Sequence, residues 1–422
     1  MMPPSLQIDE SQDRSTNSIH GLTAKSEESV NKWLKYVVFE SAEGSTITDV
    51  DGKKYIDFIA QFAVMSFGHS HPKIIKAAVD QLQKLPLVNT SYINPLYADF
   101  AERITKKFNY DSITSMCTGA EAVDGACKIA RKWAYVKKGV PADKAIILTA
   151  DSCYHGMTLS TMSMTDSILE NFGRHLPNVG PFAPESGKLI KFGETDVLKE
   201  TFEASGDVIA AFVVEPVQGS AGCRVPPEGY LKTVQDLCHK HNVLFICDEV
   251  QSGYCRTGTD MAYQQEAGVQ PDLITLGKAV TGGLYPMSII MGKSHVMDTL
   301  RKYEVGSTFA ASTVACAAAL AALDVMEEEQ LSERSKRLGV VLTKAIDDAN
   351  LPYVTLHQGR NRGLFQTLTV DESAPNVTAR RIAALCALRG MLCGCSSNRL
   401  RFSPPLVISE TEILKGKTSL AI

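Results

Sequence analysis

Short runs of apolar residues alternate with amphipathic stretches through the middle of the chain. The apolar runs are AIILT (145–149), VIAAFVVEPV (208–217), VLFICDEV (243–250) and LITLG (273–277). Between the second and third runs, residues 229–241 (GYLKTVQDLCHKH) carry their apolar side chains at helical spacing. Strands that are apolar at nearly every position and alternate with helices predict a parallel sheet that is buried on both faces.

The two ends of the chain show other patterns. The segment Ser45–Phe62 reads as a hairpin, because its Asp51-Gly52 pair is typical of a tight turn between strands. Pro72 then opens a stretch with apolar residues at helical spacing. After about residue 325 come a charged helical stretch (326–349), an apolar run (363–370), a second helical stretch (377–389) and the run LRFSPPLVI (400–408).

We therefore expect an α/β protein. Its large domain has a mainly parallel sheet flanked by helices, and a smaller α+β domain follows it. The expected limits are 1–72 for an N-terminal arm and hairpin segment that packs with the small domain, 73–325 for the large domain and 326–422 for the C-terminal small domain.

Composition narrows the function classes. The chain has 422 residues, of which 44% are hydrophobic and 21% charged, as in an average globular protein. The net charge of -4 argues against a nucleic-acid partner, and no stretch predicts a membrane span. Eleven cysteines without regular spacing indicate free thiols. The polar N-terminus MMPPSLQIDESQDR lacks the core of a signal peptide and is too acidic for a mitochondrial presequence, so we expect a cytoplasmic protein.

Polar residues follow three of the predicted strands at positions that packing does not explain. Asp248 ends one apolar run, Lys278 follows another, and Gly119 opens a helical stretch whose first N–H groups suit a phosphate. Ligands of parallel sheets bind at the carboxyl ends of the strands. A lysine that forms a Schiff base, a carboxylate that keeps a pyridine nitrogen protonated and a phosphate cradle together indicate pyridoxal 5'-phosphate. Each feature alone is weak, since most lysines are solvated and many strand-ending aspartates belong to turns.

Six motifs carry a resemblance to a known family. They are TGAEA (118–122), YHG (154–156), EPVQGSAG (215–222), DEVQSGYCRTG (248–258), LGKAVTGGLYP (276–286) and GSTF (306–309). From about Gly44 to Ile408 the chain resembles the class III aminotransferases, and within them the ornithine δ-aminotransferases. The resemblance implies a fold type I pyridoxal-phosphate enzyme, a homodimer with its active sites at the subunit interface, and a small-molecule amino donor and oxo acceptor.

The resemblance also assigns cofactor contacts. Lys278 would be the Schiff-base lysine and the proton carrier, and Asp248 would pair with the pyridine nitrogen. Gln251 would contact the ring hydroxyl oxygen, while Tyr154 and Val250 would lie on either side of the ring.

At the other end of the cofactor, Gly119 and Ala120 would give backbone N–H groups to the phosphate. Thr308 would reach the phosphate of the partner subunit. His155 follows the ring-stacking tyrosine, so we expect it at the cofactor rim, although a purely structural role remains open.

The substrate side departs from the ornithine enzymes. The position of their carboxylate-binding arginine is held here by Met157, and that of the glutamate that masks a second arginine by Ser220. Two pocket tyrosines align with Thr46 and Phe62, and the second arginine is kept as Arg401. Removing the charged partner of a buried carboxylate costs about 3–5 kcal/mol of binding free energy. Ornithine should therefore bind poorly unless another arginine replaces the lost one; the candidates are Arg174, Arg360, Arg362 and Arg399.

These changes favour an enzyme that uses an α-amino or α-oxo acid held by Arg401 and an amine or carbonyl compound with an apolar or neutral far end, as in a specialised pathway. A genuine ornithine δ-aminotransferase that uses 2-oxoglutarate is the alternative. A pyridoxal-phosphate enzyme with another outcome (decarboxylation, mutation or elimination) also remains open. A non-catalytic dimeric binding protein of this fold is disfavoured by the intact Lys278, Asp248, Gln251 and Thr308.

Three short motifs resemble phosphate or metal sites but lack the residues that such sites need. Gly416-Lys417-Thr418 resembles the end of a phosphate-binding loop but lacks its earlier glycine, so we expect a frayed C-terminal segment. The pairs Cys393/Cys395 and His69/His71 lack partners at metal-site spacing, and we expect no metal.

Overall fold

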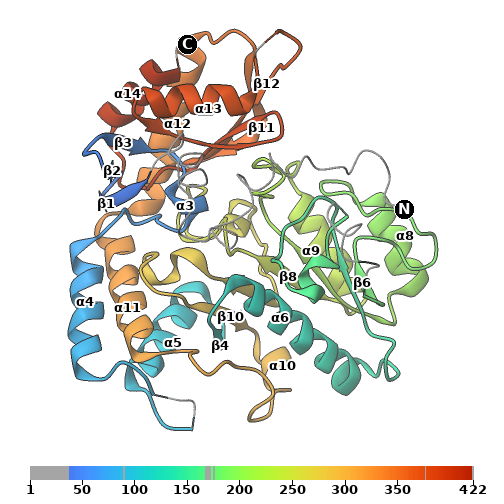
Figure 1. Ribbon diagram of the computed structural model, residues 1–422. Coiled ribbons are helices and arrows are strands. Elements are labelled where there is room, and N and C mark those ends of the chain that lie inside the picture. The colour runs from blue at the N-terminus through green and yellow to red at the C-terminus, as the bar shows by residue number, and fades with distance from the viewer. Residues whose placement is uncertain (1–37, 89–90, 167–172, 174–175, 376, 421–422) are drawn as a thin grey trace.

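The central element is a seven-stranded sheet with the order β4-β10-β9-β8-β7-β5-β6 (Figure 1). Its strands are β4 (Ser112–Met116), β5 (Ile146–Thr149), β6 (Val179–Gly180), β7 (Ile209–Val214), β8 (Leu244–Asp248), β9 (Leu273–Leu276) and β10 (Ser288–Gly292). The strands β5 to β9 pair in parallel, and β10 runs antiparallel to both of its neighbours. The expectation of an α/β fold with a mainly parallel sheet is therefore confirmed. The computed structural model describes residues 38–88, 91–166, 173, 176–375 and 377–420, so most of the expected N-terminal arm lies outside it.

Helices cover both faces of this sheet, and the strands are buried accordingly. Along β8, Leu244 and Ile246 join the core under α6 (Gly119–Trp133), whereas Phe245 and Cys247 join the core on the opposite face. The opposite face is covered by α4 (Pro72–Lys84), α5 (Pro95–Phe108), α8 (Asp196–Ser205), α9 (Tyr230–Lys240) and α11 (Thr313–Glu328). Each fully buried large apolar side chain contributes about 1.5–3 kcal/mol, which explains why these strands need apolar residues at successive positions.

Two four-stranded sheets complete the fold. One has the order β1-β2-β3-β13, with β1 (Phe39–Glu43), β2 (Thr46–Asp49), β3 (Lys54–Asp57) and β13 (Met391–Leu392). The other has the order β11-β12-β15-β14, with β11 (Val354–Arg362), β12 (Phe365–Val370), β14 (Gly394–Ser396) and β15 (Arg399–Phe402). Because β13 pairs in parallel with β3, the N-terminal hairpin lies against the C-terminal segment. The domain limits at residues 72 and 325 stay predictions.

The C-terminal helices differ from expectation in two places. The charged stretch 326–349 is not one helix: α11 ends at Glu328, and α12 (Leu331–Ala349) begins after Gln330, whose φ is 49°. The segment expected to fray forms α14 (Glu410–Leu420). A Cβ at Gly416 would lie 2.5 Å from Cζ of Phe58, so this glycine allows α14 to approach the N-terminal hairpin. The helix α13 (Ala379–Leu388) packs beside α14.

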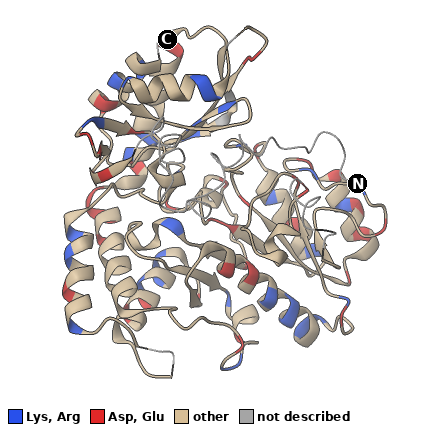
Figure 2. Ribbon diagram, in the orientation of Figure 1, with Lys and Arg blue, Asp and Glu red and all other residues tan. Residues whose placement is uncertain are grey.

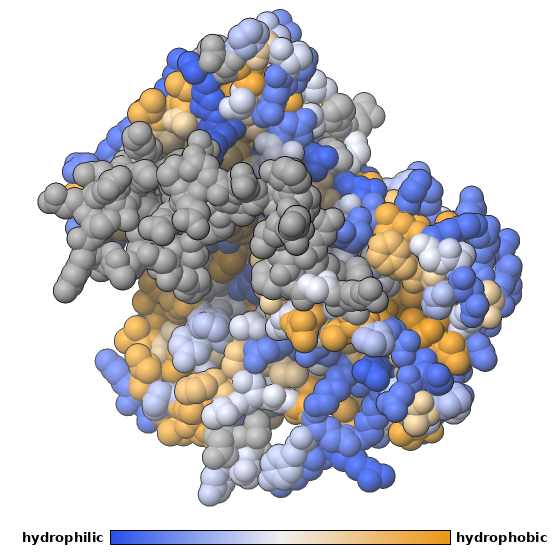
Figure 3. All heavy atoms as spheres, turned by 45° about the vertical axis from the view of Figure 1, so that its right-hand side comes forward, coloured by the Kyte–Doolittle hydropathy of each residue, from blue (hydrophilic) through white to orange (hydrophobic). Residues whose placement is uncertain are grey.

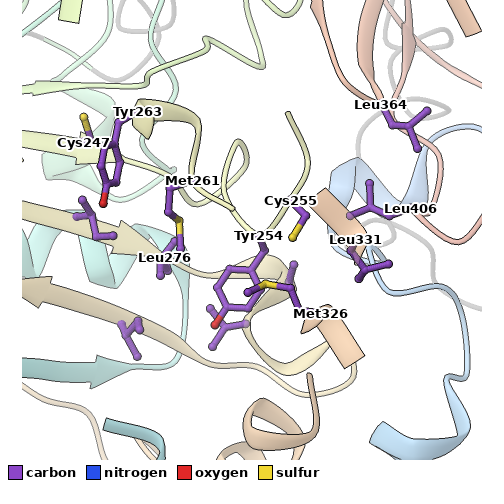
Figure 4. Close-up of a cluster of buried hydrophobic side chains, with 14 of the residues drawn as sticks. Cys247, Tyr254, Cys255, Met261, Tyr263, Leu276, Met326, Leu331, Leu364 and Leu406 are labelled. Carbon is purple, nitrogen blue, oxygen red and sulfur yellow. The ribbon is translucent and has the colours of Figure 1, made fainter. Parts of the chain in front are cut away.

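A buried cluster joins the large sheet to the C-terminal part (Figure 4). Tyr254 and Met326 lie on the side of the large sheet, and Leu331, Leu364 and Leu406 come from the C-terminal elements. All of these side chains are nearly inaccessible to solvent. The substrate-side residues near β15 are therefore anchored to the same core as the large sheet.

Shorter helical segments connect these elements. They are α3 (Ala60–Ala63), η3 (Ala134–Lys138), α7 (Leu159–Met162), η5 (Ala262–Gln265), η6 (Lys278–Thr281) and α10 (Ser294–Met297). In α3 all the residues have positive φ, between 46° and 68°, so this is a left-handed turn without glycine. Such a backbone costs about 1–2 kcal/mol per residue and persists only where neighbouring groups hold it.

Charges on α6 follow the helix dipole. Glu121 lies in its first turn, and Arg131 and Lys132 lie in its last turn (Figure 2). On the face drawn in Figure 3, hydrophilic residues are interspersed with smaller apolar patches. Within the described ranges, no helix is both long and apolar enough to cross a membrane. The eleven cysteines are free thiols.

Candidate active site

A cavity of about 450 Å³ lies at the carboxyl ends of β8 and β9 and the N-terminus of α6. It brings together most of the residues expected to contact the cofactor. Its lining comprises Thr118, Gly119, Ala120, Tyr154, His155, Gly156, Met157, Thr158, Glu215, Asp248, Val250, Gln251 and Lys278. The parallel sheet explains this convergence, because the ends of successive strands meet at one edge.

Asp248 is the most constrained acid of the lining. Its Oδ1 accepts hydrogen bonds from the Val250 N–H (3.0 Å) and the Thr275 hydroxyl (3.0 Å), and its Oδ2 lies 2.7 Å from Nδ1 of His155. The carboxylate is almost fully buried. These contacts hold the carboxylate in one orientation at the end of β8. A carboxylate that pairs with a protonated ring nitrogen needs such a fixed orientation.

His155 belongs to the lining of the cavity. Its side chain is buried and forms an ion pair with Asp248. Burial alone would lower the pKa of His155, but the contacts with Cys153 and Asp248 raise that pKa well above its usual value. The imidazolium thereby counterbalances the buried carboxylate and fixes its direction.

Lys278 follows β9 at the start of η6, where its backbone adopts a φ of 41°. Burial lowers the pKa of Lys278, against the opposing effect of the Asp248 and Glu215 carboxylates, and Arg401 lowers it further. A lowered pKa raises the share of neutral amine, the form that attacks a carbonyl carbon. The position and electrostatics of this lysine suit a nucleophile.

The start of α6 forms an anion site. Thr118 caps the helix by accepting a hydrogen bond from the Glu121 N–H (3.2 Å). The N–H groups of Gly119 and Ala120 belong to the first turn, where no intrahelical partner exists. A Cβ at Gly119 would lie 2.7 Å from Cγ1 of Val250, so only glycine lets this helix end and Val250 lie together at the cavity. A phosphate suits this helix end, and a flat ring fits beside Val250.

Comparison with known proteins decides the family. Residues 27–421 match the family Aminotransferase class-III. The chain belongs to the class III aminotransferases. An ornithine aminotransferase from Emericella nidulans is 40% identical over 384 residues, which cover 90% of this chain and 84% of that protein.

Solved structures agree with this assignment. The ornithine aminotransferase from Toxoplasma gondii superposes with a TM-score of 0.86 at 33% identity, covering 96% of each chain. An (S)-enantioselective omega-transaminase from Thermomicrobium roseum superposes with a TM-score of 0.83 at 28% identity, covering 96% of this chain and 94% of that one. This class III aminotransferase has fold type I and depends on pyridoxal 5'-phosphate, and the acid, lysine and helix start of its cavity fit that cofactor.

Glu215 is a site residue that the sequence reasoning missed in this aminotransferase. It follows β7, lines the cavity and accepts hydrogen bonds from the N–H groups of Tyr154 (2.9 Å) and Gly219 (3.1 Å). Burial raises the pKa of Glu215 to about 7. Its place directly after a buried strand is the signal that would have identified it, since Asp248 and Lys278 were found in that way.

Of the expected substrate-side residues only Met157 is in the lining of this cavity, and Thr46, Phe62, Ser220 and Arg401 are not. Gln251 connects the cavity lining with the segment of Phe62, because its Nε2 donates to the Phe62 carbonyl (3.0 Å). The guanidinium carbon of Arg401 lies 5.7 Å from the centre of the Phe62 ring. Ser220 is exposed, and Thr46 on β2 is half-buried.

Thr308 lies in a different place from the other expected cofactor contacts. It is exposed and lines a second cavity of about 580 Å³, together with Tyr303, Gly306 and Ser307 among others. One chain thus does not bring Thr308 and Lys278 to the same cavity lining.

Proposed function

We propose that this aminotransferase moves an amino group between an α-amino or α-oxo acid, held by Arg401, and an amine or carbonyl compound whose far end is apolar or neutral. One observation carries the proposal. Among the described residues that line the cavity there is no arginine, and Met157, which is 62% exposed, holds the position that the resemblance assigns to the carboxylate-binding arginine of the ornithine enzymes. A flexible thioether favours apolar groups and offers nothing to a carboxylate.

Arg401 is the candidate for holding the acid. It lies on β15 and is nearly buried, and its Nη2 has no hydrogen-bond partner in the described part of the chain. Its charge lowers the pKa of Lys278, so it acts electrostatically on the reaction centre. A buried guanidinium with a free N–H group suits a substrate carboxylate, which accepts strong charge-assisted hydrogen bonds.

The other arginines considered as replacements offer less. Arg399 donates to the Ala221 carbonyl (2.9 Å), and Arg362 is exposed and lies near the Asn361 carbonyl (3.4 Å). Arg174 and the side chain of Arg360 lie outside the described residues.

The residues of the cavity divide the chemistry among them. Pyridoxal phosphate, when bound, supplies an electron sink for the substrate carbon that carries the amino group. Asp248 would keep a ring nitrogen protonated, and the N–H groups of Gly119 and Ala120 would bind the phosphate. Tyr154 and Val250 would contact the ring. Lys278 Nζ would take the proton from the substrate carbon that carries the amino group and later release it, so this amine would act as both base and acid.

We further propose a homodimer in which Thr308 serves the site of the partner subunit. Its separation from the Lys278 cavity supports this role. Large apolar side chains near it are strongly exposed, as a surface that another chain covers would be; they are Tyr92, Ile93, Tyr303 and Phe309. For localisation we propose the cytoplasm, supported by the free thiols.

The substrate proposal is tested on the purified enzyme without an oxo acceptor. Single amino donors are added in turn, and the change in cofactor absorbance is followed over time. The panel contains ornithine, lysine, 4-aminobutyrate, glutamate, alanine and apolar primary amines. We expect alanine or apolar amines to convert the cofactor while ornithine stays inert.

A genuine ornithine δ-aminotransferase is the second candidate. The 40% identity to the Emericella nidulans enzyme favours it. Fast conversion by ornithine, ahead of all other donors, would establish this candidate and show that another basic residue replaces the lost arginine. If the substrate instead lost its carboxyl group, or lost its amino group without converting the cofactor, the enzyme would catalyse a decarboxylation or an elimination.

A further inference from the structure

The left-handed turn Ala60–Ala63 lies between the cofactor cavity and Arg401. It contains Phe62, a residue that is 54% exposed and whose ring lies against the Arg401 guanidinium. None of its residues is a glycine, although each adopts a backbone conformation that side chains disfavour. Strain of this kind is retained where surrounding groups hold the chain.

Asp57 holds the entrance of this turn. Its Oδ1 accepts hydrogen bonds from the N–H groups of Ile59 (2.8 Å) and Ala60 (2.9 Å). Its Oδ2 lies 2.7 Å from Nε2 of His69. The Asp57 side chain is inaccessible to solvent, so these bonds work without competition from water.

The other side of the turn is tied to the strand of Arg401 and to the cofactor cavity. Ser403, two residues after Arg401, donates its N–H to the Phe58 carbonyl (2.8 Å) and its hydroxyl to the Ile59 carbonyl (3.0 Å). Gln251 donates to the Phe62 carbonyl. A shift of the turn would therefore move Phe62 relative to both Arg401 and Gln251.

We propose that Asp57 is a positioning residue for the substrate side of this site. By holding the left-handed turn it sets the Phe62 ring over the Arg401 guanidinium and the Phe62 carbonyl against Gln251. Asp57 does not line the cofactor cavity, and its side-chain hydrogen bonds go to Ile59, Ala60 and His69, so it acts on Arg401 through the turn and Phe62. The inference rests on the proposed role of Arg401 as the carboxylate site.

The chain offers a matched control in Asp49. It too is buried at the end of a strand, and it accepts hydrogen bonds from the N–H groups of Asp51 (3.1 Å) and Lys53 (2.9 Å) and from the Tyr55 hydroxyl (2.8 Å). Its turn joins β2 to β3 and is exposed to solvent. Both aspartates thus accept backbone hydrogen bonds that hold a turn, but only the turn held by Asp57 contacts Arg401.

The experiment compares Asp57→Ala, Asp49→Ala and Asp57→Asn as holoenzymes. We expect similar losses of thermal stability for both alanine variants. Only Asp57→Ala should raise KM for the acid substrate, by about tenfold, with kcat and the cofactor absorbance nearly unchanged. Asp57→Asn should restore KM, because its amide oxygen still accepts both N–H groups. Equal KM values for the two alanine variants, or a fall in kcat alone, would overturn the inference.

Two further variants keep the test decisive. If Asp57→Ala does not fold, Ser403→Ala removes the side-chain bond to the Ile59 carbonyl at the start of the turn, and an unchanged KM there would contradict the inference. Arg401→Ala is measured in parallel. If it loses the acid substrate while Asp57→Ala does not, only this inference fails; if it keeps the acid substrate, the proposed function fails and the inference with it.

Discussion

His155 and Asp248 form a buried pair in which Nδ1 of the histidine lies 2.7 Å from Oδ2 of the carboxylate. Both residues line the cavity, and Asp248 is also held by the Val250 N–H and the Thr275 hydroxyl. A buried carboxylate requires such partners, because leaving it unpaired is strongly unfavourable. The orientation of the acid that faces the cofactor therefore depends on a histidine from another loop.

Replacement of His155 should weaken cofactor binding. We expect His155→Ala to raise the Kd of pyridoxal phosphate by about tenfold to a hundredfold, because a hydrogen bond to a charged group contributes about 1.5–3 kcal/mol. Titration of the apoenzyme, followed by absorbance, measures this Kd. His295 is the control, since it pairs with Asp272 at 3.2 Å but is largely exposed. Equal losses in His155→Ala and His295→Ala would contradict the prediction.

Lys278→Ala should abolish both the visible absorbance of the bound cofactor and all turnover. No other lysine lines the cavity among the described residues, so no amine there can replace it. Lys293→Ala serves as the control and should keep both signals, because Lys293 follows the end of β10 that pairs with Leu273, the end of β9 away from Lys278. A colourless wild-type protein would instead support the non-catalytic binding protein.

Met157→Arg should improve the use of ornithine. The Met157 side chain is largely exposed to the cavity, so a longer side chain has room there. Hydrogen bonds between a guanidinium and a carboxylate contribute about 1.5–3 kcal/mol, which corresponds to roughly tenfold or more in kcat/KM. Steady-state rates with ornithine measure the gain, and Met157→Leu, which adds no charge, should show none.

Glu215 should make stability fall as the pH rises. Burial raises the pKa of Glu215 to about 7, from 4.5, so the unfolded chain loses this proton at lower pH than the folded protein. The contribution of Glu215 to the free energy of unfolding is complete below about pH 4.5 and is lost as the pH approaches 7. The free energy of unfolding changes by about 3 kcal/mol over this range. Denaturant unfolding across this range should show a shallower decline for Glu215→Gln.

Glu249 gives the matched comparison for this prediction. Burial also raises its pKa to about 7, but its carboxylate bonds to Ser252 and the Tyr263 N–H rather than to cavity residues. Glu249→Gln should flatten the stability profile to a similar degree. Only Glu215→Gln should change the pH dependence of the cofactor absorbance, and an identical change in both variants would argue against a role of Glu215 at the cofactor.

Local sequence patterns determined the large sheet and the main elements of the site. The apolar runs became β5, β7, β8 and β9, because strands buried on both faces need apolar residues on both faces. Asp248 and Lys278 could be located from position alone, since each follows such a strand and parallel strands end at one edge. The motifs of these strand ends also identified the family.

Tertiary structure alone decided the contacts between distant segments. The His155–Asp248 pair, the approach of α14 to Phe58 at Gly416, and the placing of Phe62 over Arg401 join residues far apart in the chain. The left-handed turn at Ala60–Ala63 has no glycine to indicate it. Periodicity records only whether a side chain is buried, whereas these features depend on which segment lies opposite, and that is determined by the packing of the whole chain.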